Sequence, residues 1–77
     1  MRYGASSNLP PEKVIEKAKT YFEKLGLKVV SQDPGSVCME GAGGRVTVTA
    51  CGENETDVEV LTEEWDFQVK QFIQMIG

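Results

Sequence analysis

The sequence predicts a two-layer α+β domain that spans residues 1–77, with two helices on one face of an antiparallel sheet. Three observations indicate this class. Apolar residues recur at helical spacing near both ends of the chain, they alternate with polar residues through the middle, and turn sequences separate the alternating segments. The expected order is a helix, a meander of four strands and a second helix, with residues 2–7 as a candidate fifth strand before them.

The first helix is expected to begin near Pro11 and to end before Gly26. Proline suits the first helical position because its missing N–H would have no partner there. Glycine at the other end supplies the left-handed cap that commonly ends a helix. Between them an apolar stripe about 120° wide faces the expected core. Its members are Val14, Ile15, Ala18, Tyr21, Phe22 and Leu25.

After this helix the apolar period changes from helical spacing to two. The expected strands are 27–32, 37–41, 45–51 and 56–61. Residues 33–36 form a turn between the first two strands, because proline and glycine occupy its central positions. The inner face of 27–32 is left unassigned, since Val29 and Val30 are adjacent and alternation therefore does not choose between them.

Polarity predicts how these strands pair. A two-residue turn at Ala42 and Gly43, followed by a three-residue loop at 53–55, sets residues of like polarity opposite each other, whereas a shift by one residue would oppose apolar and polar side chains. The expected partners are Gly41 with Gly44, Glu40 with Arg45, Met39 with Val46, Cys38 with Thr47, Val37 with Val48, Ala50 with Val58, Val48 with Val60 and Thr49 with Glu59.

The second helix is expected to begin at Thr62, which is a good N-cap residue, and Trp65 is expected at the centre of its apolar stripe. The stripe consists of Trp65, Val69, Phe72, Ile73 and Ile76. Phe67 lies outside it, about 200° away from Trp65 around the helix. A large aromatic residue is therefore predicted on the side that faces water.

Length and charge narrow the class of protein. A chain of 77 residues forms one domain with little room for a spacious internal pocket. The net charge of −4 argues against a broad attraction to nucleic acid or to an anionic membrane, so neither partner is expected. The start of the chain lacks the apolar stretch of a secretory signal, and no apolar run is long enough to span a membrane. We therefore expect a cytoplasmic protein.

In element order the whole chain resembles the β-α-β4-α layout of the TATA-binding-protein half-repeat and of shortened helix-grip domains. The resemblance implies an open sheet face. In the TATA-binding protein that face binds DNA, but here it would present Glu40, Arg45, Asp57 and Glu59. An acidic face repels phosphates, so the resemblance concerns the fold and transfers no function.

Few residues have the chemistry of a catalytic or metal site. The chain lacks histidine, the commonest general base and metal ligand. Cys38 and Cys51 would lie about 13 Å apart along the strands, too far for a disulfide. The glycines at 41–44 join two strands rather than a strand and a helix, which favours a hairpin over a phosphate loop. We expect no catalytic residue, no metal and no cofactor, and hence no enzyme.

Two charged clusters each have a functional and a structural interpretation. Carboxylates alternate along 53–59 and would suit a hard cation, but the loop lacks the ligand spacing and central glycine of an EF-hand, and a solvated strand face explains them better. On the first helix, Lys13, Lys17, Thr20 and Lys24 share a flank that would attract an anion, although basic flanks are ordinary on surface helices. The structural interpretation is favoured in both cases.

Phe67, together with Leu61 on the outer side of the last strand, is the candidate partner surface, because aromatic residues are enriched at interface cores. The leading hypothesis is a small non-enzymatic binding or interaction module that self-associates or binds a protein partner. The alternative is a small apolar ligand held in a crevice between the C-terminal helix and the sheet.

Overall fold

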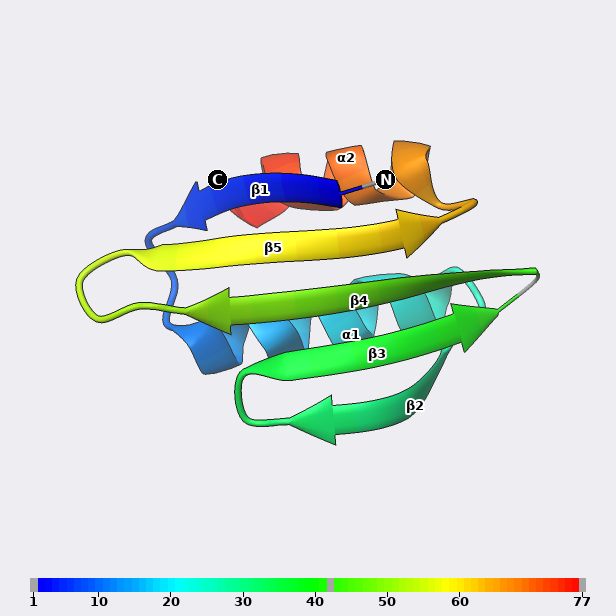
Figure 1. Cartoon of the computed structure of the whole chain (residues 1–77), viewed down its shortest axis with the longest axis horizontal. Helices are drawn as coiled ribbons and strands as arrows, with labels where there is room; N and C mark the ends of the chain where they lie inside the picture. The colour runs from blue at the N-terminus through cyan, green and yellow to red at the C-terminus, as the bar shows by residue number, and fades with distance from the viewer. Residues whose placement is uncertain (1, 42, 77) are drawn as a thin grey trace.

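The seven elements of the computed structural model follow the predicted order, and the structure describes residues 2–41 and 43–76. They are β1 (Arg2–Ser7), α1 (Pro11–Lys24), β2 (Lys28–Asp33), β3 (Ser36–Gly41), β4 (Gly44–Cys51), β5 (Thr56–Glu63) and α2 (Asp66–Ile76). The sheet order is β1-β5-β4-β3-β2, and all neighbours are antiparallel (Figure 1). The α+β class is confirmed, with the candidate strand present as the fifth strand.

Both predicted hairpin registers are confirmed. Glu40 pairs with Arg45 in the first hairpin, and Ala50 pairs with Val58 in the second. In the turn between β3 and β4, Gly43 has a φ of 87°, which a residue with a side chain rarely adopts. Ala42, the other predicted turn residue, lies outside the described residues.

Helix α1 begins at Pro11 as predicted and ends in a Schellman motif. Gly26 has a φ of 100°, and its N–H donates to the carbonyl oxygen of Glu23 at 3.0 Å. The N–H of Leu27 donates to the carbonyl oxygen of Phe22 at 3.1 Å. Phe22 and Leu27 are both buried, so the cap also directs the chain from α1 into the core.

The prediction that α2 begins at Thr62 is wrong. β5 continues to Glu63, Thr62 pairs with Val46 in the sheet, and α2 begins at Asp66. Threonine suits a strand as well as an N-cap, and here its side chain continues the buried alternation of β5. Glu64, with a φ of 72°, then turns the chain between strand and helix.

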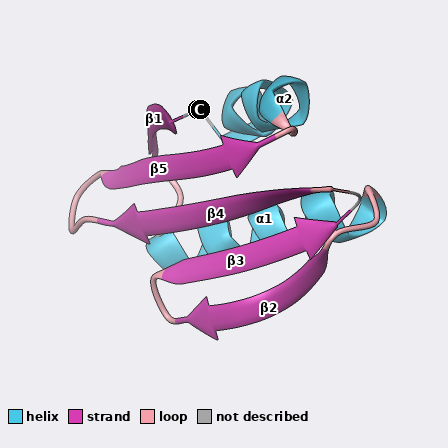
Figure 2. Cartoon of the chain, turned by 45° about the vertical axis from the view of Figure 1, so that its right-hand side comes forward, coloured by secondary structure: helices cyan, strands magenta, loops and turns pink. Residues whose placement is uncertain are grey.

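Both helices cover the same face of the sheet and enclose one apolar core (Figure 2). α1 packs against β2, β3 and β4, and α2 packs against β1 and β5. Phe22 and Phe72 join the two helices, with ring centroids 5.6 Å apart. Trp65, expected at the centre of the stripe, is only partly buried and lies just before α2, where its Nε1 donates to the carbonyl oxygen of Gly41 at 3.3 Å.

Candidate interaction surface

The other face of the sheet is left bare by the two helices. In Figure 1 the strands lie in front of both helices, so the view is onto this face. Strand alternation determines which side chains it presents, because residues two apart point to the same side. The outward residues are Arg2, Gly4, Ser6, Lys28, Ser31, Asp33, Ser36, Cys38, Glu40, Arg45, Thr47, Thr49, Cys51, Asp57, Glu59, Leu61 and Glu63.

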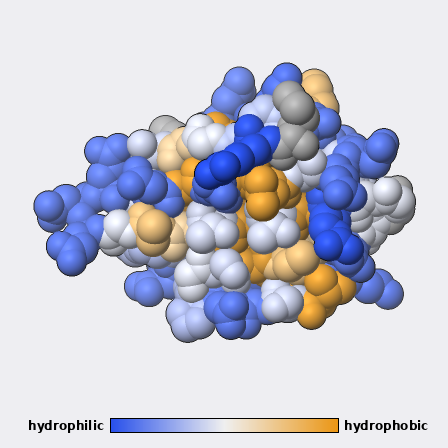
Figure 3. Space-filling view, viewed as in Figure 1, coloured by the Kyte–Doolittle hydropathy of each residue, from blue (hydrophilic) through white to orange (hydrophobic). Residues whose placement is uncertain are grey.

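Uncharged side chains form a row across β3, β4 and β5 on this bare face. The row runs from Cys38 through Thr47 to Leu61. Leu61 is 46% exposed, and Thr47 Oγ1 donates to Cys38 Sγ at 3.4 Å. Figure 3, from the same side, shows white and orange surface across the middle and blue surface mainly around it. The centre of the face is therefore easier to desolvate than its margin.

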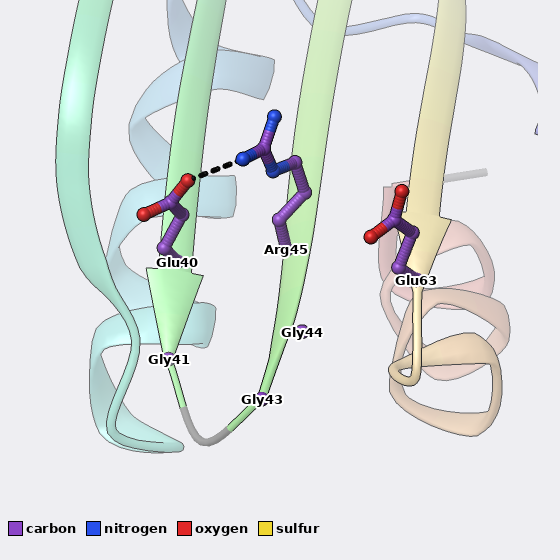
Figure 4. Close-up of a pocket in the computed structure, with 6 residues that line it drawn as sticks. All are labelled: Glu40, Gly41, Gly43, Gly44, Arg45 and Glu63. Carbon is purple, nitrogen blue, oxygen red and sulfur yellow. Dashed lines mark hydrogen bonds and ion pairs between the residues drawn. The ribbon is translucent and has the colours of Figure 1, made fainter.

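At one end of the bare face, charged residues line a shallow hollow of about 430 Å³ (Figure 4). Arg45 Nη2 lies 2.7 Å from Glu40 Oε1, and Glu63 stands opposite Arg45 on β5. The side chains of Arg45 and Glu40 are about half exposed, so this pair contributes at most about 1 kcal/mol to stability. Among residues 2–41 and 43–76, no group of histidine, cysteine or acidic side chains has the arrangement of a metal site.

β1 is tied to α2 through Tyr3. The Tyr3 hydroxyl donates to Asp66 Oδ1 at 3.1 Å, and Lys70 Nζ lies 6.0 Å from the centre of the Tyr3 ring. Desolvation, followed by the interaction with Asp66, raises the pKa of Tyr3 above its ordinary value. The phenol is therefore protonated at neutral pH, where it acts as a hydrogen-bond donor that holds strand to helix.

The structure does not bring Phe67 and Leu61 together on one face. Leu61 points outward from β5 on the bare face, directly opposite Arg2 of β1. Phe67 lies on the outer side of α2, behind the sheet, and is 68% exposed. Because α2 also packs against β1, the two residues flank this strand from opposite sides of the sheet. The candidate partner surface is thus divided into two parts by β1.

The other sequence candidates remain separate. Cys38 and Cys51 are both free thiols, as their predicted separation requires. The space between α2 and the sheet is filled by Val69, Phe72 and Ile76, each at most 3% exposed. An open groove of about 330 Å³ lies instead between the helices. It is lined by Glu16, Lys17, Thr20, Tyr21, Lys24 and Met75.

Sequence reasoning missed two features of this surface. Met75 lines the groove and is 56% exposed. The sequence indicated this exposure only in that Met75 does not belong to the apolar stripe of α2. The free edge of β1 was also missed, because the pairing of β1 with β5 joins segments from opposite ends of the chain. The sequence did contain a signal for a strand with two different faces. Along residues 2–7, Tyr3, Ala5 and Ser7 alternate with Arg2, Gly4 and Ser6.

Comparison of the sequence with protein-family models and with curated proteins gave no match. Within the described ranges, neither α1 nor α2 has the length and apolar character needed to cross a membrane.

Proposed function

We propose that this protein is a small, non-enzymatic interaction module that self-associates. The observation that carries the proposal is that β1, an edge of the sheet, borders no other strand than β5 among the described residues and lies next to exposed apolar side chains. Leu61 beside β1 is 46% exposed, and Phe67 on the helix that packs against β1 is 68% exposed. Exposed aromatic side chains are enriched at the core of protein interfaces.

The polar groups near β1 also favour binding over catalysis. Tyr3 donates to Asp66, and Arg2 Nη2 lies 2.6 Å from Glu59 Oε2, so each has a partner within the chain. These intrachain contacts order the surface next to the free edge of β1.

Sedimentation velocity of the wild-type protein over a wide range of concentrations tests this function. We expect the sedimentation coefficient to rise from the monomer value to the dimer value as the concentration increases. A protein that stays monomeric at every concentration up to hundreds of micromolar would contradict self-association. Its dimerisation free energy would then be weaker than about 5 kcal/mol.

A second candidate function is the binding of a small apolar ligand, and the groove between the helices favours it. Tyr21 and Met75 contribute apolar surface to the lining of the groove, and Lys17 and Lys24 contribute two positive charges beside the single negative charge of Glu16. A ligand with an apolar body and an anionic end matches this lining. Native mass spectrometry of freshly purified protein tests the idea, and Met75→Glu is the matched variant that should lose the added mass.

A further inference from the structure

The two edges of the sheet are built differently. β2, at one edge, has a bulge between Val29 and Ser31 and charged residues at both ends, Lys28 and Asp33. Bulges and charges are the usual means by which edge strands avoid pairing with other chains. The β2 edge is therefore protected against a further strand.

β1, at the other edge, has no bulge, and Arg2 at its start is its one charged residue. Its six residues pair with β5 in one unbroken register, from Arg2 opposite Leu61 to Ser7 opposite Thr56. In the part of the chain that the structure describes, β1 pairs with β5 alone and borders no other strand. After Arg2 and Tyr3 its side chains are small, so a neighbouring backbone can approach closely.

We propose that a second copy of this chain pairs antiparallel with β1, so that two five-stranded sheets join into one of ten strands. The inference rests on the proposed self-association and names its surface. A second copy fits because a two-fold axis across an antiparallel pair gives each β1 the same environment. Main-chain hydrogen bonds between the two strands then satisfy the free edge groups of both copies.

The alternation of β1 restricts the register of this pairing. Tyr3, Ala5 and Ser7 face the core side, while Gly4 and its outward neighbours face the bare side. The two sheets keep their faces aligned only if inward residues pair with inward residues. A two-fold axis at Gly4 meets this condition. It sets Gly4 opposite its own copy and the large Tyr3 opposite the small Ala5 of the other chain.

Charge favours the register centred on Gly4. In it Arg2 lies opposite Ser6 of the second copy, and Ser6 is itself paired with Asp57 in its own chain. The Arg2 guanidinium, which pairs with Glu59 of its own chain at 2.6 Å, is thereby also placed near a carboxylate of the second copy across a small side chain. The alternative centred on Ala5 moves Arg2 beyond Ser7, the end of the partner strand, and loses this complementarity.

The helix layer fits the same arrangement. Ser7 Oγ donates to the carbonyl oxygen of Ile76 at 2.7 Å, and the Tyr3 hydroxyl bonds Asp66, so α2 runs alongside β1. A helix centred over the gap between β1 and β5 would lie about 10 Å from its two-fold copy, within the usual distance of packed helices. Asp66 accepts the hydrogen bond from Tyr3, so it lies on the flank of α2 that faces β1, and Phe67 is the next residue along the helix.

Disulfide cross-linking at Gly4 tests the register directly. A side chain added at Gly4 meets no heavy atom within 4 Å, so Gly4→Cys is accommodated in the monomer. In a background of Cys38→Ser and Cys51→Ser, mild oxidation should convert most of this variant into a covalent dimer. Symmetry-related Cβ atoms at this position would be about 5 Å apart, close to disulfide distance.

Ser6→Cys in the same background is the matched control. Ser6 is on the same strand and the same exposed side as Gly4. The two Ser6 residues of the dimer would be about 13 Å apart, so cross-linking should be at least tenfold less than at Gly4. Equal cross-linking at the two positions, or none at Gly4, would overturn the β1 interface.

The same measurements separate this inference from the proposed function. If the wild-type protein forms dimers in sedimentation but Gly4→Cys gives no preferential cross-link, the module self-associates through another surface and only the β1 interface fails. If the wild-type protein stays a monomer and Gly4→Cys gives no cross-link, both fail. Concentration-dependent dimers together with a Gly4-specific cross-link establish both.

Discussion

The two faces of the sheet are made by the same five strands but have opposite roles. The covered face carries valine, methionine and phenylalanine contacts that are almost completely buried, whereas the bare face carries small polar residues and exposed charges. Alternate residues of one strand contribute to each. The comparison shows that neighbouring residues of one strand lie in opposite environments, so a buried residue and an exposed one can be changed separately.

The largest expected effect is on the covered face. Phe72→Ala should lower the free energy of unfolding by about 3–5 kcal/mol, because Phe72 is fully buried and contacts Phe22 across the helix layer. Leu61→Ala on the bare face should cost less than about 1 kcal/mol. Urea unfolding followed by tryptophan fluorescence measures both, and similar losses would contradict the division between the faces.

A second comparison uses two glycines on the sheet. A Cβ at Gly44 would overlap the carbonyl oxygen of Glu63 and lie 2.8 Å from Trp65 Cδ1, so Gly44→Ala should destabilise the fold by about 1–3 kcal/mol or more. Gly4→Ala has open space and should stabilise it by roughly 0.5 kcal/mol. Thermal unfolding compares the two, and equal midpoints would show that the turn at 63–65 does not depend on close approach to Gly44.

The two exposed apolar residues should differ in their effect on self-association. Phe67→Ser should weaken the dimer about fivefold, roughly 1 kcal/mol, because Phe67 borders the proposed helix contact. Leu61→Ser should change the dissociation constant of the dimer by less than about twofold, because the pairing of two β1 edges does not cover the bare face. Sedimentation equilibrium measures both constants. A larger effect at Leu61 would move the interface to the bare face.

The smallest effect concerns Tyr3. Its pKa is higher in the folded protein than in the unfolded chain, so above pH 10 the folded state binds more protons than the unfolded state. The contribution of Tyr3 is fully present below the ordinary tyrosine pKa and is lost as the pH rises through the folded-state pKa. Tyr3→Phe should reduce this alkaline loss of stability, which urea titrations on either side of pH 10 would detect. An unchanged alkaline slope would contradict the assignment.

Features of the fold that depend on residues close together in the sequence could be predicted from it. Both hairpin registers followed from alternation, because a shift of one residue reverses every side chain of a strand. Thr62 was misassigned because its local preference suits an N-cap and a strand alike, and pairing with Val46 decided between them. The strand at 2–7 was expected, but its partner was not, since β1 and β5 lie at opposite ends of the chain.

The exposure of each residue of the candidate partner surface could be predicted from the sequence, but the positions of these residues relative to each other could not. The exposure of Phe67 followed from helical spacing alone, and the outward position of Leu61 followed from alternation. Their places on opposite sides of β1 depend on which face α2 covers. That choice is made by the packing of Val69 and Phe72 on the sheet, and it cannot be read from periodicity.

The hydrogen bond between Ser7 and Ile76 also bears on how the protein folds. It joins residues separated by 69 positions, and β1 finds its sheet partner only near the other end of the chain. Contacts of such high sequence separation form late, because the cost of closing the loop precedes any gain. We therefore expect β1 to enter the sheet after the other four strands, and until then it has two unpaired edges instead of one.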